Sequence, residues 1–411
     1  MNDLQRRNRK SLFPGFAKIG AIFGVTLIGV MVLVTGTQAA VRSSANYTMN
    51  KDVLDSGGGS SSSANYQLDG SIGQSSPVGP ATSANFRNIS GYFPALLLNV
   101  VRGKNDLVVN IPGTGVTVLF NNNTSSTLLH ADTAEAIGVA DVDANGEDDV
   151  IVSFVAGSGP GGTGGTFISR NRTPLVLLDT NIAEQIASGN LDGAFGDDLL
   201  LNSGAAGLAL VLNDTGIIPF VPAPTEAIAI GDVDNSGLDD LVFSIIGFGT
   251  AVLKDFTTVD VLDTDAANVL AVADMDNNGE GDVVASFPAG TGPGGVSGTY
   301  ISRNQGALVL LDANSAEEMA VGSLDGADGE DLLIDLGAPG LFFDLNDTGL
   351  ISFIPVSTSA IAIGDTDDSG LEDMFMSIPT LGTTVLKDFA TFEVLDPVEA
   401  VDLATGNVDG N

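Results

Sequence analysis

Residues 232–240 carry short oxygen-bearing side chains at alternate positions, which is the spacing of a loop that binds a hard cation. Counted from Asp232 as position 1, such side chains stand at positions 1, 3, 5 and 9, and Gly237 stands at position 6. Side chains spaced in this way can converge on one ion, and the main-chain carbonyl at position 7 can supply a further oxygen. The glycine permits the sharp turn between the two halves of the loop. This spacing therefore predicts the binding of Ca²⁺ by oxygen atoms.

Similar segments recur along the chain. Residues 141–149, 274–282 and 365–373 keep the oxygen positions and the glycine. Residues 190–198 and 323–331 have alanine at position 5 and lack the glycine at position 6, so we expect weak metal binding there or none. A single loop of this kind could be a turn held by side-chain hydrogen bonds alone, whereas four intact copies favour metal binding.

The spacing of these loops predicts a repeat architecture. Position 1 falls at residues 141, 190, 232, 274, 323, 365 and 407. The intervals are 49, 42, 42, 49, 42 and 42 residues, so a block of 133 residues occurs twice. A period in this range is typical of stacked supersecondary units.

Each repeat has the pattern of four short strands. In residues 227–262, four apolar or β-branched runs alternate with turn residues, which matches one blade of a β-propeller. Residues 103–108 resemble the second half of a loop with its following strand, and residues 407–411 resemble the first half. Joined in space, they would complete a seventh repeat and close the ring; the alternative is that further repeats are missing beyond residue 411. We therefore predict an all-β, seven-bladed propeller over residues 99–411, closed by the N- and C-terminal halves of one repeat.

The segment before the propeller divides into two parts. Residues 1–39 combine a basic start, an apolar run at 19–36 and small residues after it, which is typical of a cleaved, bacterial-type export signal. An uncleaved membrane anchor is the competing interpretation. Both interpretations place the rest of the chain outside the cytoplasm, secreted or at the cell surface.

Residues 40–98 are rich in Ser and Gly and contain three similar motifs, which begin at Ser44, Ser63 and Ser83. A flexible stalk is one interpretation of this composition, and short hairpins are the other. The motifs resemble a "SANY" segment found near the N-terminus of some exported bacterial proteins. That resemblance implies no activity.

Composition restricts the partners and the chemistry. The chain has 15 Lys+Arg against 52 Asp+Glu, which gives a net charge of −37. Nucleic acids and anionic membrane surfaces bind basic proteins, so we expect neither as a partner of the folded part. The absence of cysteine excludes disulfides, thiolate catalysis and cysteine zinc sites. No pattern singles out a nucleophile or a general base, so no catalytic residue is predicted.

The loops resemble those of the FG-GAP (VCBS-type) repeat family, which includes the propeller of integrin α-chains. Residues 231–242, the Phe248–Gly249 pair and the copies of the loop carry this similarity. It implies a seven-bladed propeller with Ca²⁺ in the hairpins between the first and second strands of several blades. The ligands that it implies are the side chains at positions 1, 3, 5 and 9 and the carbonyl at position 7: Asp141, Asp143, Asn145, Glu147 and Asp149; Asp232, Asp234, Ser236, Leu238 and Asp240; Asp274, Asp276, Asn278, Glu280 and Asp282; Asp365, Asp367, Ser369, Leu371 and Asp373.

Three functions remain open. We expect a calcium-binding, exported and monomeric module that acts without catalysis in adhesion or recognition, with a surface protein or glycan as its partner. A polysaccharide hydrolase or lyase with carboxylates in the central channel is the second possibility, and a structural surface component is the third. Glycine-rich residues 157–165 and 290–295 are candidates for a binding lip. Arg170 and Arg303 are expected to pair with nearby Asp residues, and His130 is expected to be incidental.

Overall fold

The computed structural model describes six short strands between residues 42 and 88 and the chain at residues 105–121, 123–327 and 329–410. Two compact units are present, Met1–Val100 and Val101–Asn411. The predicted export signal or anchor, residues 1–39, lies outside the described residues. In the described part of the chain, no helix is long and apolar enough to cross a membrane.

The first unit contains a six-stranded antiparallel sheet in which each strand pairs with the next. Its strands are β1 (Arg42–Ser44), β2 (Tyr47–Met49), β3 (Gly58–Ser63), β4 (Tyr66–Ser71), β5 (Ala81–Ser83) and β6 (Phe86–Asn88). In each repeated motif the Ser and the aromatic residue are cross-strand partners: Ser44 with Tyr47, Ser63 with Tyr66, and Ser83 with Phe86. Two residues separate the partners in each motif.

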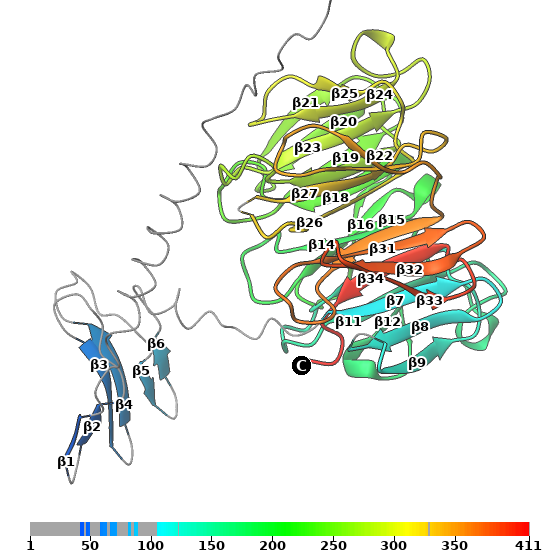
Figure 1. Ribbon diagram of the computed structural model, residues 1–411. Helices are drawn as coiled ribbons and strands as arrows, with labels where there is room; N and C mark the ends of the chain where they lie inside the picture. Colours follow the sequence, from blue (N-terminus) through cyan, green and yellow to red (C-terminus); the bar gives the residue numbers. More distant parts are fainter. Residues whose placement is uncertain are drawn as a thin grey trace, which may run out of the picture. The chain divides into compact units, whose positions relative to one another are not determined.

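The second unit is a seven-bladed β-propeller, which confirms the predicted fold class (Figure 1). Each blade is a four-stranded antiparallel sheet. The first strands of the blades contact one another in a closed cycle, so they surround the axis of the propeller. These first strands are β10 (Ala136–Ala140), β14 (Gln185–Gly189), β18 (Thr225–Gly231), β22 (Val269–Ala273), β26 (Glu318–Gly322), β30 (Ala360–Gly364) and β34 (Asp402–Gly406).

The other three strands of each blade follow outward from the axis. The second strands are β7 (Asp106–Ile111), β11 (Asp149–Phe154), β15 (Asp198–Asn202), β19 (Asp240–Ile245), β23 (Asp282–Phe287), β27 (Asp331–Asp335) and β31 (Asp373–Ile378). The third strands are β8 (Gly115–Phe120), β12 (Gly165–Ser169), β16 (Leu208–Val211), β20 (Gly249–Lys254), β24 (Gly298–Ser302), β28 (Leu341–Asp344) and β32 (Gly382–Lys387). The fourth strands are β9 (Ser125–His130), β13 (Val176–Asp179), β17 (Ile217–Val221), β21 (Thr258–Asp263), β25 (Val309–Asp312), β29 (Ile351–Ile354) and β33 (Thr391–Asp396).

Four short 3-10 turns complete the second unit. They are η1 (Pro160–Gly162), η2 (Arg170–Arg172), η3 (Gly204–Ala206) and η4 (Pro293–Gly295). The glycine-rich segments that were predicted as a binding lip contain η1 and η4. Both turns lie between the second and third strands of their blades, at the opposite end of the second strand from the acidic loops.

The seventh blade joins the two ends of the propeller. Strand β34 pairs with β7 in an antiparallel register that places Asp402 opposite Asn110 and Gly406 opposite Asp106. In Figure 1 the red β34 lies beside the cyan β7. The predicted closure of the ring is confirmed, and every blade has the same four strands.

The core lies between adjacent blades. Every residue of β11, β19 and β23 is buried, because the second strand packs against a neighbouring blade on both faces of its sheet. This explains why these strands are nearly continuous apolar runs rather than alternating ones. In one core cluster, Val242 and Val252 of one blade pack with Val283 and Ala285 of the next.

Glycine ends most of the first strands because adjacent blades approach closely at the axis. A Cβ atom on Gly189 would lie 2.5 Å from Ile230 Cγ2, and one on Gly231 would lie 2.5 Å from Val272 Cγ1. Both contacts are far shorter than real Cβ contacts, so a larger residue would push the blades apart. The acidic loops begin immediately after these glycines, at positions that the packing of the blades holds in place.

Candidate metal centre

All seven loops between first and second strands end in a buried aspartate, which is the first residue of the second strand. These aspartates are at most 1% exposed: Asp106, Asp149, Asp198, Asp240, Asp282, Asp331 and Asp373. The loops that lack some predicted ligands therefore keep position 9, and so does the loop that is divided between the two chain ends.

The buried aspartate links its loop to a second turn of the same blade. Asp240 Oδ2 accepts a hydrogen bond from the main-chain N–H of Val233 at 3.1 Å, and Oδ1 accepts one from the N–H of Asp255 at 2.9 Å. Asp255 lies in the turn between the third and fourth strands. Burial raises the pKa of Asp240 to about 6, although the N–H of Asp255 opposes this shift. Burial likewise raises the pKa of Asp149 to about 7 and that of Asp373 to about 6.

The aspartate at position 1 accepts hydrogen bonds from main-chain N–H groups of its own loop. The Asp232 carboxylate accepts the main-chain N–H of Ser236 at 3.0 Å and that of Gly237 at 2.8 Å. The other three intact loops repeat both bonds. Gly237 has φ +87°, a conformation that favours glycine. The glycine at position 6 therefore has the conformational role that was predicted for it.

Two of the four intact loops bring three carboxylates together. One oxygen each of Asp232, Asp234 and Asp240 lie within 4.8 Å of one another. The loop at residues 365–373 forms a second group of this kind, in which Asp367 and Asp373 are joined by Asp388. Either group could hold a metal ion.

Asp388 and its repeat counterpart Asp255 are site residues that the sequence analysis missed. Each is the first residue of the turn after the third strand. Ser369 Oγ donates to Asp388 Oδ1 at 2.6 Å, and Ser236 Oγ donates to Asp255 Oδ1 at 2.9 Å. The signal that could have identified them is the Lys-Asp-Phe triplet at residues 254–256, which recurs at 387–389.

Unpartnered oxygen atoms lie inside both groups. Asp373 is fully buried, and its Oδ1 has no hydrogen-bond partner among the described residues. Asp234 Oδ1 is likewise buried without a described partner. A buried acceptor without a partner costs about 1–3 kcal/mol, and a charged one costs more. An oxygen-only donor set with an unsatisfied carboxylate oxygen fits a hard divalent cation.

The two remaining intact loops face an Asn at the turn position that Asp255 and Asp388 occupy in the other two blades. Asn171 occupies the turn position, and its Nδ2 donates to Asp143 Oδ2 at 3.1 Å. Asn304 makes the same bond to Asp276 Oδ2 at 3.4 Å. Position 5 also donates here, since Asn145 Nδ2 bonds to Asn171 Oδ1 at 2.6 Å. Within the described residues, neither loop forms a group of three carboxylates.

The position-7 residues and the remaining predicted ligands also have defined places. The N–H groups of Glu147 and Glu280 each donate at 2.7 Å to the side-chain oxygen at position 5. Leu238 and Leu371 donate their N–H to the position-5 serine at 3.2 Å, and their carbonyls lie 3.3 and 3.2 Å from its Oγ. In the amide-containing loops, Asp149 Oδ2 and Asp282 Oδ2 are buried without a described partner.

In the two loops that were predicted to bind metal weakly or not at all, an Asn side chain donates an amide hydrogen to the aspartate at position 3. Asn213 Nδ2 donates to Asp192 Oδ2 at 2.5 Å, and Asn346 Nδ2 donates to Asp325 Oδ2 at 2.8 Å. The divided loop follows the same pattern, with Asn121 Nδ2 2.6 Å from Asp409 Oδ2. The described parts of these loops contain no group of three carboxylates.

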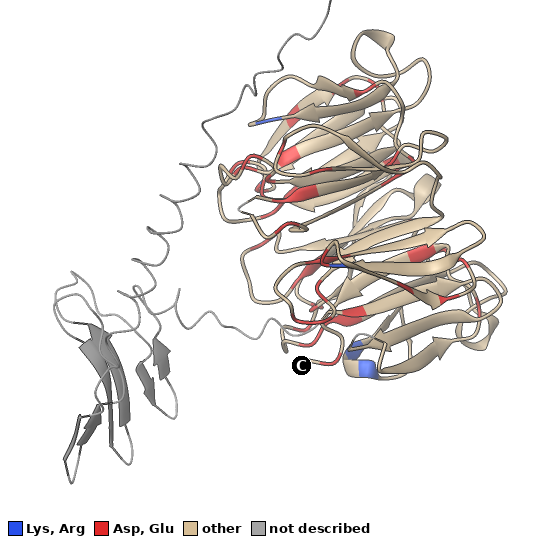
Figure 2. Cartoon of the chain, in the orientation of Figure 1, with Lys and Arg blue, Asp and Glu red and all other residues tan. Residues whose placement is uncertain are grey.

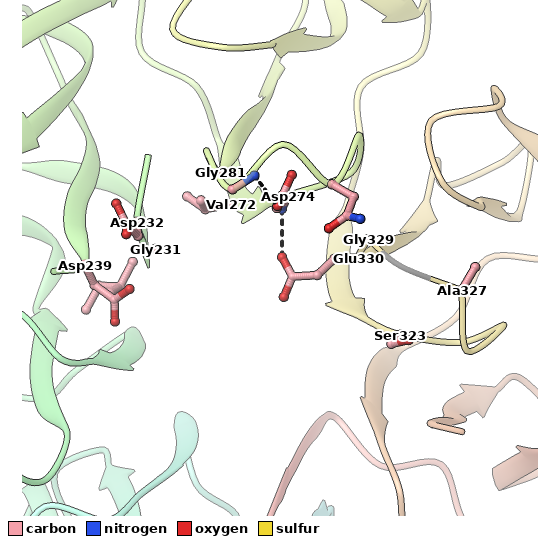
Figure 3. A pocket seen from close by; sticks show the side chains of 13 residues that line it. Gly231, Asp232, Asp239, Val272, Asp274, Gly281, Ser323, Ala327, Gly329 and Glu330 are labelled. Atoms are coloured by element: carbon pink, nitrogen blue, oxygen red, sulfur yellow. Dashed lines mark hydrogen bonds between the residues drawn. The ribbon is translucent and has the colours of Figure 1, made fainter. Parts of the chain in front are cut away.

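An acidic pocket of about 560 Å³ lies beside these loops (Figure 3). Asp232, Asp239, Asp274 and Glu330 contribute its carboxylates. Glu330 Oε2 accepts the N–H of Asp274 at 2.8 Å, and Asp239 Oδ2 accepts the N–H of Asn190 at 2.7 Å. Burial, together with the neighbouring carboxylates, raises the pKa of both side chains despite these bonds. The position-8 acids thus join one loop to the loop of the preceding blade.

Lys and Arg residues are few in the described part of the propeller (Figure 2), and each of them is engaged in an ion pair. The pairs are Arg170–Asp214, Arg172–Glu147, Lys254–Asp260, Arg303–Asp347 and Lys387–Glu393. Arg170 Nε lies 3.0 Å from Asp214 Oδ2, and Arg303 Nε lies 2.8 Å from Asp347 Oδ2. The predicted pairing of the two arginines is confirmed, and each pair connects adjacent blades.

Two partly buried carboxylates lie on first strands, away from the loops. Glu318 begins β26 and Asp402 begins β34. Asp402 Oδ2 accepts the N–H of Ile137 at 2.8 Å, and Glu318 accepts that of Ile361. Burial raises the pKa of Asp402 to about 7. Burial first, and then the charge of Asp402, raises the pKa of Glu318 to about 8.

No protein-family model and no curated protein sequence matches the chain. Similar solved structures include BBS1N in complex with ARL6DN, at 12% identity over 66% of this chain and 83% of that chain, with a TM-score of 0.46. A Dos1 propeller has 11% identity over 68% and 74% of the two chains, with a TM-score of 0.43. An ancestral GH74 enzyme has 11% identity over 80% and 54%, also with a TM-score of 0.43. At these identities and TM-scores, none of them indicates a function for this chain.

Proposed function

We propose that this chain is an exported, calcium-binding propeller of the FG-GAP type that recognises a partner without catalysis. The observation that carries the proposal is the pair of carboxylate groups with buried, unpartnered oxygens, Asp234 Oδ1 and Asp373 Oδ1. An acidic chain outside the cytoplasm meets plentiful calcium, which would neutralise these groups. Export rests on the predicted signal at residues 1–39.

The ion would act as a structural link within its blade. Asp232, Asp234 and Asp240 would hold it in one loop, and Asp367, Asp373 and Asp388 in the other. Bound there, calcium supplies positive charge among carboxylates that otherwise repel one another. It would also fix the loop against the turn between the third and fourth strands, which these carboxylates already adjoin.

Recognition would use the surface that these loops form. The acidic pocket lined by Asp239 and Glu330 lies next to the loop at residues 232–240. Its size is within the range of ligand pockets, and its charge favours a basic group of a protein over a neutral glycan. A surface protein is therefore the partner that the pocket supports best.

A titration of the purified protein with calcium tests the metal role. We expect heat of binding by calorimetry and a melting temperature about 10 °C higher in calcium than in chelator, because ligands that bind only the folded state stabilise it. Magnesium at equal ionic strength is the control, since it demands a tighter octahedral site. Absence of binding heat together with identical melting in calcium and chelator would contradict the proposal.

Glu318 and Asp402 give a specific reason to test a second function, a hydrolase or lyase that acts on polysaccharides. Two carboxylates of raised pKa on axial strands are the kind of pair that acid–base chemistry requires. Turnover of a glycan panel that is lost in Glu318→Gln and Asp402→Asn, but retained in Asp234→Asn, would favour the enzyme. A panel without turnover would favour recognition.

A further inference from the structure

We infer that tight metal binding is confined to two of the four intact loops, and that Asp255 and Asp388 are the additional ligands that select them. This inference rests on the proposed calcium role and refines it. The selecting residue lies outside the loop, in the turn between the third and fourth strands of the same blade. Its type, Asp or Asn, determines whether the blade needs an ion.

The blade that begins with β30 shows the arrangement most fully. Carboxylate oxygens of Asp367, Asp373 and Asp388 lie within 4.8 Å of one another. Oδ2 of Asp373 accepts the hydroxyl of Thr366 at 2.7 Å, whereas its Oδ1 is fully buried and has no partner among the described residues. The unpartnered oxygen belongs to a carboxylate of the group that contains Asp388, so a cation bound by this carboxylate could satisfy it.

The blade that begins with β18 has an Asp at the same turn position, Asp255. Asp234 and Asp240 form the group with Asp232, and Asp234 Oδ1 is buried without a described partner. Asp255 adjoins the group, since its N–H donates to Asp240 Oδ1 at 2.9 Å and its charge raises the pKa of Asp240. Its own Oδ1 accepts the hydroxyl of Ser236.

The five other blades show what happens when the turn residue is Asn. All seven turn residues have positive φ between 45° and 49°, a conformation that Asn and Asp tolerate better than most residues: Asn121, Asn171, Asn213, Asp255, Asn304, Asn346 and Asp388. Each of the five Asn side chains donates an amide hydrogen to the carboxylate at loop position 3. An Asp at this place can donate no hydrogen when ionised and adds a negative charge instead.

The nearby lysines are held by other acids. Lys254 Nζ lies 2.6 Å from Asp260, and Lys387 Nζ lies 2.8 Å from Glu393, both on the fourth strand of the blade. These pairs supply a matched control, because Asp260 and Glu393 are acids of the same blades that lie outside both carboxylate groups.

Calorimetric titration of the full chain with calcium tests the inference. We expect wild type to bind two tight ions, and Asp255→Asn with Asp388→Asn to weaken tight binding by about 10–100-fold, the range seen when groups that support a metal site are removed. The control carries Asp260→Asn with Glu393→Gln, which makes the same change in charge, and we expect it to keep both ions. Retention of both tight ions by the first double variant overturns the inference.

A gain-of-site variant keeps the test decisive if the loss variant folds poorly. Asn304→Asp places a carboxylate beside Asp276 and Asp282, and we expect a third tight ion. An unchanged stoichiometry of two in this folded variant overturns the inference. If wild type binds no calcium, the proposed function fails first; if it binds four ions equally tightly, the proposed function stands and the inference falls.

Discussion

Two adjacent blades differ in how they satisfy the same buried carboxylate. In the blade that begins with β26, Asp331 accepts the N–H of Asn346 on one oxygen and the N–H of Leu324 on the other, at 2.9 and 2.8 Å. In the next blade, the corresponding Asp373 has one oxygen without a partner among the described residues. Both aspartates are at most 1% exposed, so burial alone does not distinguish them.

The two blades also differ in the turn that faces the loop. Asn346 uses its N–H on Asp331 and its amide on Asp325 at 2.8 Å, so both oxygens of Asp331 are satisfied from within the chain. Asp388 brings a further carboxylate to the second blade, which adds negative charge to be balanced. Blades with the same fold thus contain one loop that hydrogen bonds stabilise and one loop that a bound ion would stabilise.

Removing each buried aspartate gives the largest test of this comparison. We expect Asp331→Ala to lower stability by about 2 kcal/mol in calcium and in chelator alike, because buried N–H groups lose their acceptor. Asp373→Ala should cost about 3 kcal/mol or more in calcium and much less in chelator, since it removes a ligand and also a source of repulsion. Thermal melting of both variants under both conditions measures the contrast. Equal calcium dependence of the two variants would contradict the comparison.

Much of this arrangement was predictable from the sequence. The period of the loops predicted the repeated blades, because each blade of a propeller packs against its neighbours in the same way. Residues 407–411 and 103–108, as the two halves of one repeat, predicted the seventh blade and the closure of the ring. The Asp and Gly positions of the loops also predicted where carboxylates gather, since alternate side chains on one tight turn face the same space.

Asp255 and Asp388 were not predictable in the same way. Asp255 follows Asp240 by fifteen residues, and the two meet only because the second and third strands pair and return the chain to the loop. A lone Asp in a turn has no spacing that marks it as a ligand. The four intact loops therefore looked equivalent, although Asn171 and Asn304 make two of them different.

Substitution of Glu318 tests whether a buried carboxylate outside the acidic loops also destabilises the fold when no cation neutralises it. Its pKa is raised from the ordinary 4.5 to about 8, mainly by burial, so its favourable contribution is complete below pH 4.5 and is lost as the pH rises through about 8. Glu318→Gln keeps an acceptor for the N–H of Ile361 and removes the charge. We expect this variant to be about 2 kcal/mol more stable than wild type above pH 8, after allowance for partial exposure, and no more stable at pH 4.

Melting curves in chelator across this pH range measure that difference, because any metal is then absent from the acidic loops of both proteins. Asp260→Asn, at an exposed acid, is the control and should show no comparable gain. If Glu318→Gln and wild type have the same pH dependence, the Glu318 carboxylate is solvated well enough to ionise freely. Buried charge without a counter-ion would then destabilise only the loops.

The smallest effect is expected at Ser369, which sharpens the comparison within the calcium-type loops. Its hydroxyl donates to Asp388 Oδ1 at 2.6 Å and lies 3.2 Å from the carbonyl of Leu371. Ser369→Ala keeps every carboxylate of the group but removes the group that orients Asp388, so we expect calcium affinity to fall by only a few-fold, about 1 kcal/mol. Calorimetry on this variant measures how much calcium affinity depends on the orientation of Asp388 rather than on its charge. A loss as large as that of Asp388→Asn would mean that Ser369 itself binds the ion, as the resemblance to FG-GAP loops implied for position 5.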